Sequence, residues 1–98
     1  MRPGASGAVL VVCALAAGCA RRATRAECDQ VLDHYVEMLV REQNGELDAH
    51  KFRAQFERTR TRAGLDPSFA DCPKELRLGA VKCAMAAPNV DELERCLQ

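Results

Sequence analysis

The cysteines limit what this chain of 98 residues can fold into more than any other feature. Two of the six, Cys13 and Cys19, lie in the first nineteen residues, and the others are Cys28, Cys72, Cys83 and Cys96. A domain this small buries only about 60% of its unfolded surface and is marginally stable without additional ties. Four cysteines are the even number that a disulfide framework requires. We therefore expect two disulfides, provided that the chain reaches an oxidising compartment.

A capping motif at residues 24–27, Thr-Arg-Ala-Glu, predicts the start of a first helix. In this motif Thr24 caps the helix and Glu27 reaches back to the backbone of Thr24. Apolar residues then recur at spacings of three and four, as on one buried face of a helix. The expected face comprises Cys28, Val31, Leu32, Tyr35 and Leu39. Asn44-Gly45 predicts the end of the helix, with Gly45 in the left-handed conformation.

A second helix is expected from Asp48, which would cap it, to Gly64, which would end it. Leu47 and Phe52 are placed to pack together across its start as a hydrophobic staple. The expected inner face comprises Phe52, Phe56, Thr59 and Ala63. Residues 65–71 include Pro67 and predict a loop.

Prolines and an asparagine delimit two further helices. Pro73 suits the first turn of a third helix, where its missing N–H costs nothing, and Pro88 predicts the end of that helix. A fourth helix is expected after Asn89, which would cap it, and Glu92 stands three residues after this cap. The expected buried residues are Leu76, Ala80, Cys83 and Ala87 in the third helix, and Leu93, Cys96 and Leu97 in the fourth. No stretch alternates in the manner of a strand. The sequence therefore predicts an all-α fold of two disulfide-stapled helical hairpins, about four helices in all.

These hairpins select among the three possible pairings of the four cysteines. The third and fourth helices should run antiparallel, which would bring Cys83 level with Cys96. Cys72 would lie about 16 Å from Cys83 along one helix, which is too far for a disulfide. Cys28 begins the first helix, and the chain after Gly64 would return Cys72 to its neighbourhood. We predict the pairs Cys28–Cys72 and Cys83–Cys96.

The first nineteen residues have the layout of an export signal. Arg2 precedes an uncharged run from Ala8 to Ala17, and small residues then lead to a cysteine. The segment Leu15-Ala16-Ala17-Gly18-Cys19 resembles the lipobox of a bacterial lipoprotein precursor. The resemblance implies cleavage before Cys19 and attachment of lipid to that cysteine. The expected division of the chain is a signal peptide at 1–18, a lipidated tether at 19–23 and a helical domain at 24–98.

Two other interpretations of this segment stay open. One is an ordinary secretory signal that is cleaved near Ala17 and leaves Cys19 unmodified. The other is an uncleaved anchor, although a run of about ten residues is much shorter than the roughly 20 that span a bilayer. Ala20 stands where some lipoproteins have the aspartate that retains them at the inner membrane. The resemblance therefore implies a place in the bacterial cell envelope, on the periplasmic face of the outer rather than the inner membrane.

The charge of the chain gives no support to nucleic-acid binding. The chain has 14 basic and 14 acidic residues, and removal of residues 1–18 would take away one basic residue, Arg2. A nucleic-acid-binding domain would show a basic excess. Arg21, Arg22 and Arg25 would lie beside the lipid, where anionic headgroups attract basic side chains.

The candidate metal-binding and catalytic residues form no motif. Cys28 and His34 stand six residues apart, on different faces of the expected helix, and His50 belongs to another helix. No Cys-x-x-Cys or His-x-x-x-His spacing is present, so we expect no metal and no cofactor. Ser68 lacks the setting of a catalytic nucleophile. We expect that the protein is not an enzyme.

Two hypotheses about function follow. The first is a lipid-anchored, non-enzymatic interaction or structural module that contacts another envelope protein. The second is a periplasmic thiol–disulfide or small-ligand accessory protein in which one cysteine pair is reducible. The Ala-rich helix, the Pro-Asn turn and the final helix with its cysteine resemble short cysteine-stapled helical lipoproteins of Gram-negative bacteria. That resemblance implies a fold and a location, and no activity.

Overall fold

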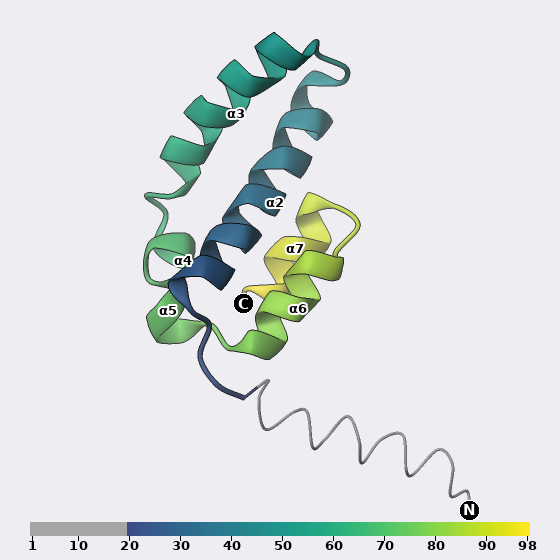
Figure 1. Cartoon of the computed structure of the whole chain (residues 1–98). Helices are drawn as coiled ribbons and strands as arrows, with labels where there is room; N and C mark the ends of the chain where they lie inside the picture. Colours follow the sequence, from purple (N-terminus) through teal and green to yellow (C-terminus); the bar gives the residue numbers. More distant parts are fainter. Residues whose placement is uncertain (1–19) are drawn as a thin grey trace, which may run out of the picture.

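The computed structural model describes residues 20–98, which form helices with no strand among them. Two hairpins make up the body: α2 (Arg25–Asn44) with α3 (Ala49–Ala63), and α6 (Leu78–Ala86) with α7 (Val90–Cys96). Two one-turn helices, α4 (Pro67–Ala70) and α5 (Cys72–Glu75), connect the hairpins. Helix α2 lies between α3 on one side and α6 and α7 on the other (Figure 1). The predicted all-α fold with disulfide staples is confirmed.

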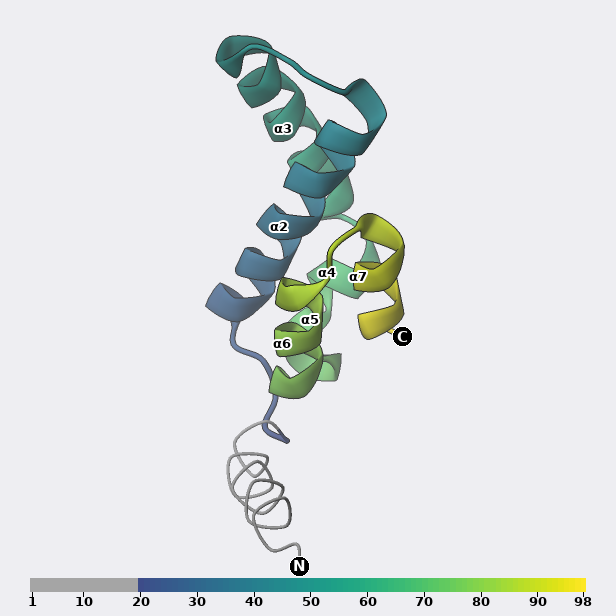
Figure 2. The same ribbon diagram turned by 90° about the vertical axis from the view of Figure 1, so that its right-hand side faces the viewer.

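The two hairpins differ in length, and this sets the shape of the molecule. The α6–α7 hairpin lies beside the N-terminal half of α2, and the far end of the α2–α3 hairpin extends beyond it (Figure 2). The backbone N–H of Val90, at the start of α7, donates to Glu42 Oε2 of α2 over 3.2 Å. The Arg60 Nε of α3 pairs with Asp33 Oδ1 of α2 at 2.5 Å. Helix α3 and the α6–α7 hairpin are thus both bonded to α2, which is the central helix.

The predicted helix caps are present. Thr24 Oγ1 accepts from the Glu27 backbone N–H at 3.1 Å, and Glu27 Oε1 accepts from the Thr24 N–H at 2.9 Å, which completes the capping box. Asp48 caps α3 through the backbone N–H of Lys51, and Asn89 caps α7 in the same way. Gly45 ends α2 with a φ of 65°, but its ψ of −136° lies outside the left-handed helical region that we expected.

The buried face of α2 is broader than the predicted stripe. Its buried residues are Cys28, Val31, Leu32, Val36 and Val40. Tyr35 and Leu39, which we expected in the core, are only half-buried. Helices pack against α2 from two sides, so the residues between them are covered most completely. Tyr35 and Leu39 instead border the hollow between α2, α3 and α4.

Residues 65–71 do not form the simple loop that was expected, because α4 lies within them. Asp66 Oδ1 accepts from the Ser68 backbone N–H at 2.9 Å, and Pro67 occupies the first helical position. Phe69 is 7% exposed and belongs to the core. Pro67 therefore starts a helical turn here, since proline is favoured at that position.

The expected third helix is also interrupted, at Leu76 and Arg77, which separate α5 from α6. Both residues have extended backbones. The carbonyl oxygen of Leu76 accepts from the Ala23 N–H at 2.8 Å, so it bonds to a residue far away in the sequence. After this break the buried residues of α6 are Val81 and Ala84, and Cys83 is exposed, contrary to the predicted face.

Both predicted disulfides are present. The Cα–Cα distance is 6.0 Å for Cys28–Cys72 and 5.7 Å for Cys83–Cys96. The first bond joins the start of α2 to α5, and the second joins α6 to α7. The pairing rests on the order of the hairpins and on one continuous third helix, and the structure contradicts only the second premise. It holds nevertheless because Cys83 and Cys96 face each other across the α6–α7 hairpin.

Candidate functional site

The end of the domain at which the N-terminal segment enters is the candidate site. Arg22 and Arg77 form an isolated antiparallel bridge. On its two sides Ala23 N–H donates to the Leu76 carbonyl at 2.8 Å, and Leu78 N–H donates to the Arg21 carbonyl at 2.9 Å. Ala23 is 5% exposed. Part of the segment that we expected to be a tether is thus hydrogen-bonded to the domain (Figure 1).

The three predicted membrane-proximal arginines all lie near this end, but they differ in their contacts. Both terminal nitrogens of Arg21 bond to the Glu27 carboxylate, at 3.0 and 2.9 Å. Arg25 donates to the carbonyl oxygens of Phe69 and Ala70, which ties α2 to α4. The side chain of Arg22 is exposed and has no hydrogen-bond partner within residues 20–98. Arg22 is therefore the one best able to meet an external anion.

Glu27 is the most strongly perturbed carboxylate at this end. The hydrogen bonds from Arg21 lower its pKa to about 2, and the bond from the Thr24 backbone N–H acts in the same direction. Both of these contacts are stronger when the carboxylate is ionised. Glu27 therefore fastens the incoming segment to the first turn of α2 while it is charged.

Arg77 is a member of this site that the sequence did not reveal. Its Nη1 donates to the Ala20 carbonyl at 2.6 Å. The two residues are separated by 57 positions, and no local motif links them. Only the backbone pairing between residues 21–23 and 76–78 brings them together.

Cys19, the predicted lipidation site, lies outside the described residues, as does the signal segment 1–18. Ala20 is the first residue that the structure describes. Between residues 20 and 98, no helix is long and apolar enough to cross a membrane. The attachment of lipid to Cys19 therefore stays a prediction.

The two histidines are not brought together with other metal ligands. His34 is partly buried, with an Nε2 atom that has no hydrogen-bond partner in the described part of the chain, while His50 is exposed near the start of α3. The described residues contain no group of three or more His, Cys, Asp or Glu side chains that could hold a metal ion.

Comparison with known proteins adds no family to this picture. The chain matches no protein-family model, no curated protein and no solved structure.

Proposed function

We propose that this chain is a lipid-anchored protein of the bacterial cell envelope, on the periplasmic face of the outer membrane, whose helical domain is a non-enzymatic interaction module. The observation that carries the proposal is the sequence Leu15-Ala16-Ala17-Gly18-Cys19, which is followed immediately by a folded domain. In this proposal residues 1–18 are removed and Cys19 becomes the acylated first residue. Its partners are the membrane and another envelope protein.

The contacts at residues 20–23 support close attachment to the membrane. Arg77 holds the carbonyl of Ala20, and the backbone of Ala23 is bonded to Leu76. An acylated Cys19 would therefore stand one residue from the first contact with the domain. The domain would sit at the level of the lipid headgroups and would have little freedom to swing away.

Lipid chains and basic side chains would contribute unequally to the anchor. A single acyl chain binds a membrane only marginally, whereas two or more hold a protein stably. An arginine near an anionic surface adds about 1 kcal/mol. Arg22 is the best placed to do so, and Arg21 and Arg25 would act while still bound to Glu27 and to α4. The arginines would thus orient the domain rather than hold it.

Replacement of Cys19 by serine tests the anchor directly. We expect Cys19→Ser to abolish metabolic labelling with palmitate and to leave a longer precursor, which keeps residues 1–18. The matched control is Cys13→Ser, which removes the other cysteine of the N-terminal segment and should keep the label. If the unaltered protein takes up no palmitate and Cys19→Ser is still processed after residue 18, the protein is secreted without lipid.

One observation favours the alternative, a thiol–disulfide accessory protein: Cys83 is exposed, and a reductant can reach its disulfide with Cys96. Structural disulfides of exported proteins have reduction potentials below about −300 mV. A value for Cys83–Cys96 well above this limit would support a redox role, and a value below it would leave the interaction module as the function.

A further inference from the structure

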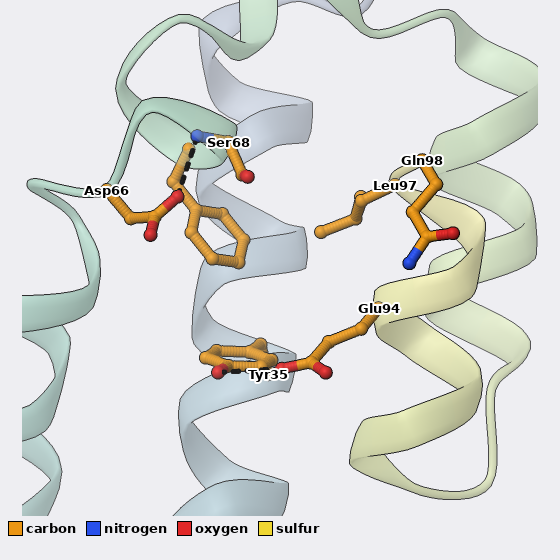
Figure 3. A pocket seen from close by; sticks show the side chains of 7 residues that line it. Tyr35, Asp66, Ser68, Glu94, Leu97 and Gln98 are labelled. Atoms are coloured by element: carbon orange, nitrogen blue, oxygen red, sulfur yellow. Dashed lines mark hydrogen bonds between the residues drawn. The ribbon is translucent and has the colours of Figure 1, made fainter.

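A hollow of about 240 Å³ opens between α2, α4 and α7 (Figure 3). Its walls include Tyr35 of α2, Phe69 of α4, Leu97 that follows α7, and two acidic side chains, Asp66 and Glu94. The volume is slightly below the range of pockets that hold drug-sized ligands. It would suit a small molecule or a single side chain of a partner.

Two aromatic rings form one wall of this hollow. The ring centroids of Tyr35 and Phe69 lie 5.2 Å apart, at an angle of 43°. Phe69 is buried in the core, which fixes the position of its ring, and Tyr35 packs against it. The face of an aromatic ring attracts positive charge because of its quadrupole.

Two carboxylates border the same space from opposite sides (Figure 3). The Tyr35 hydroxyl donates to Glu94 Oε2 at 3.2 Å, which links α2 to α7. Asp66 Oδ1 accepts from the Ser68 backbone N–H at 2.9 Å, and this bond holds Asp66 at the start of α4. Both carboxylates are thus held in position by contacts with neutral groups.

Neither carboxylate forms an ion pair in the described part of the chain. The ion pairs there involve Glu27, Glu37, Asp33 and Glu92, and neither Asp66 nor Glu94. No lysine or arginine lines the hollow. Arg62 lines a neighbouring hollow that shares Tyr35, Asp66 and Phe69, but it makes no ion pair with Asp66.

The Tyr35 hydroxyl senses both charges. Its pKa is raised first by burial, then by the charge and hydrogen bond of Glu94, and also by the charge of Asp66. Glu94 and Asp66 therefore both act electrostatically on the same hydroxyl group, which borders the hollow.

We propose that this hollow binds an organic cation, an alkylammonium or alkylguanidinium group, between the carboxylates of Asp66 and Glu94 and beside the ring of Tyr35. The aromatic wall favours such a cation over a bare metal ion, which would need more oxygen ligands than the two carboxylates supply. The cation would be a free small molecule or the lysine or arginine side chain of a partner protein. The proposal goes beyond lipid anchoring and does not depend on it.

Tyr35 itself provides the signal for a test, since the chain has one tyrosine and no tryptophan. The purified full chain, with both disulfides formed and in mild non-ionic detergent, is titrated with n-butylguanidinium chloride while its tyrosine fluorescence is recorded. We expect a saturable change at concentrations that leave the helical circular dichroism unaltered. Sodium chloride at equal ionic strength and neutral 1-butanol should produce no saturable change. Bound guanidinium should also lower the pKa of Tyr35 in an alkaline absorbance titration.

Two conservative variants test the carboxylates without removing their structural bonds. Glu94→Gln keeps an acceptor for the Tyr35 hydroxyl, and Asp66→Asn keeps a good helix cap. Each should weaken binding of n-butylguanidinium about tenfold, as expected for one charge-assisted hydrogen bond. The matched control is Glu92→Gln, which removes a charge of α7 that is paired with Arg95 outside the hollow. Equal effects of Glu94→Gln and Glu92→Gln, or a signal that does not saturate, would overturn the proposal.

The source of the cation is resolved by comparing ligands. N-butylammonium is compared with a blocked tripeptide, acetyl-Gly-Lys-Gly-amide, under the same conditions. Tighter binding of the peptide would identify a partner's lysine as the natural occupant, and tighter binding of the free amine would identify a small metabolite. Failure of both, together with n-butylguanidinium, would overturn the proposal and leave the lipid anchor untouched.

Discussion

The two disulfides of this protein lie in contrasting surroundings. Cys28 and Cys72 are 1% and 2% exposed and belong to the core, whereas Cys83 is exposed and Cys96 half-buried. The buried bond spans 44 positions and joins the start of α2 to α5. The exposed bond spans 13 positions within the α6–α7 hairpin.

This difference separates two roles of a disulfide in a small domain. The buried bond fixes the arrangement of distant segments, and its sulfurs also fill core volume. The exposed bond reinforces a hairpin that already packs on α2 through the core residues Val81, Ala84 and Leu93. We therefore expect the first bond to decide whether the domain folds and the second to adjust how firmly α7 is held.

The largest contrast should appear in chemical reactivity. On graded addition of a small dithiol to the folded protein, Cys83–Cys96 should be reduced first because a reductant can reach it, and Cys28–Cys72 only as the domain unfolds. Alkylation followed by peptide mass mapping would identify the thiols at each step. Labelling of Cys28 and Cys72 before Cys83 and Cys96 would contradict the expected order of reduction.

Removal of each bond should have unequal effects on stability. Loss of the loop closure costs about 4 kcal/mol for Cys28–Cys72 and about 3 kcal/mol for Cys83–Cys96 in the chain-entropy model. The first value is a lower limit, since Cys28→Ala with Cys72→Ala also leaves a cavity in the core. Urea unfolding of this double variant and of Cys83→Ala with Cys96→Ala, followed by circular dichroism, would give both values. Equal losses would show that the burial of Cys28–Cys72 adds nothing.

The smallest expected effect is a change in the pH dependence of stability, and it concerns Glu27, the residue before Cys28 of the buried disulfide. Its pKa is lowered from about 4.5 to about 2 in the folded protein, so its stabilising contribution is present above pH 4.5 and is lost as the pH falls towards 2. The stability difference between the protein and Glu27→Gln should shrink over that range. Thermal unfolding between pH 2 and 6 would measure it. Glu92→Gln, within the α6–α7 hairpin, serves as control, and an identical pH profile for both variants would contradict this role of Glu27.

Local sequence signals predicted much of the fold correctly. The capping side chains of Thr24, Asp48 and Asn89 each act within three residues of their own position, so their contacts could be read from the sequence. The disulfide pairing followed from the order of the hairpins. The loop expected around Pro67 is wrong because proline both interrupts helices and begins them, and here Asp66 caps a helical turn that buries Phe69.

The candidate functional features also divide into those that the sequence reveals and those that only the folded chain reveals. The lipobox-like segment and the arginines that follow it are contiguous and were visible from the start. The hollow was not, because Tyr35 and Glu94 are separated by 59 positions and meet only after α7 has packed on α2. Arg77 likewise joins the N-terminal segment only through the folded backbone.

The sequence by itself determined the helical content, the caps and the cysteine framework, since these depend on contacts between near neighbours and on side-chain chemistry. The tertiary structure alone decided where the third helix breaks, which residues of α2 are buried and which carboxylates face each other. The physical reason is that local and distant hydrogen-bond donors compete for the same backbone carbonyl. The Leu76 carbonyl could have continued a helix, but in the folded chain it accepts from Ala23, a partner that packing supplies and the local sequence does not.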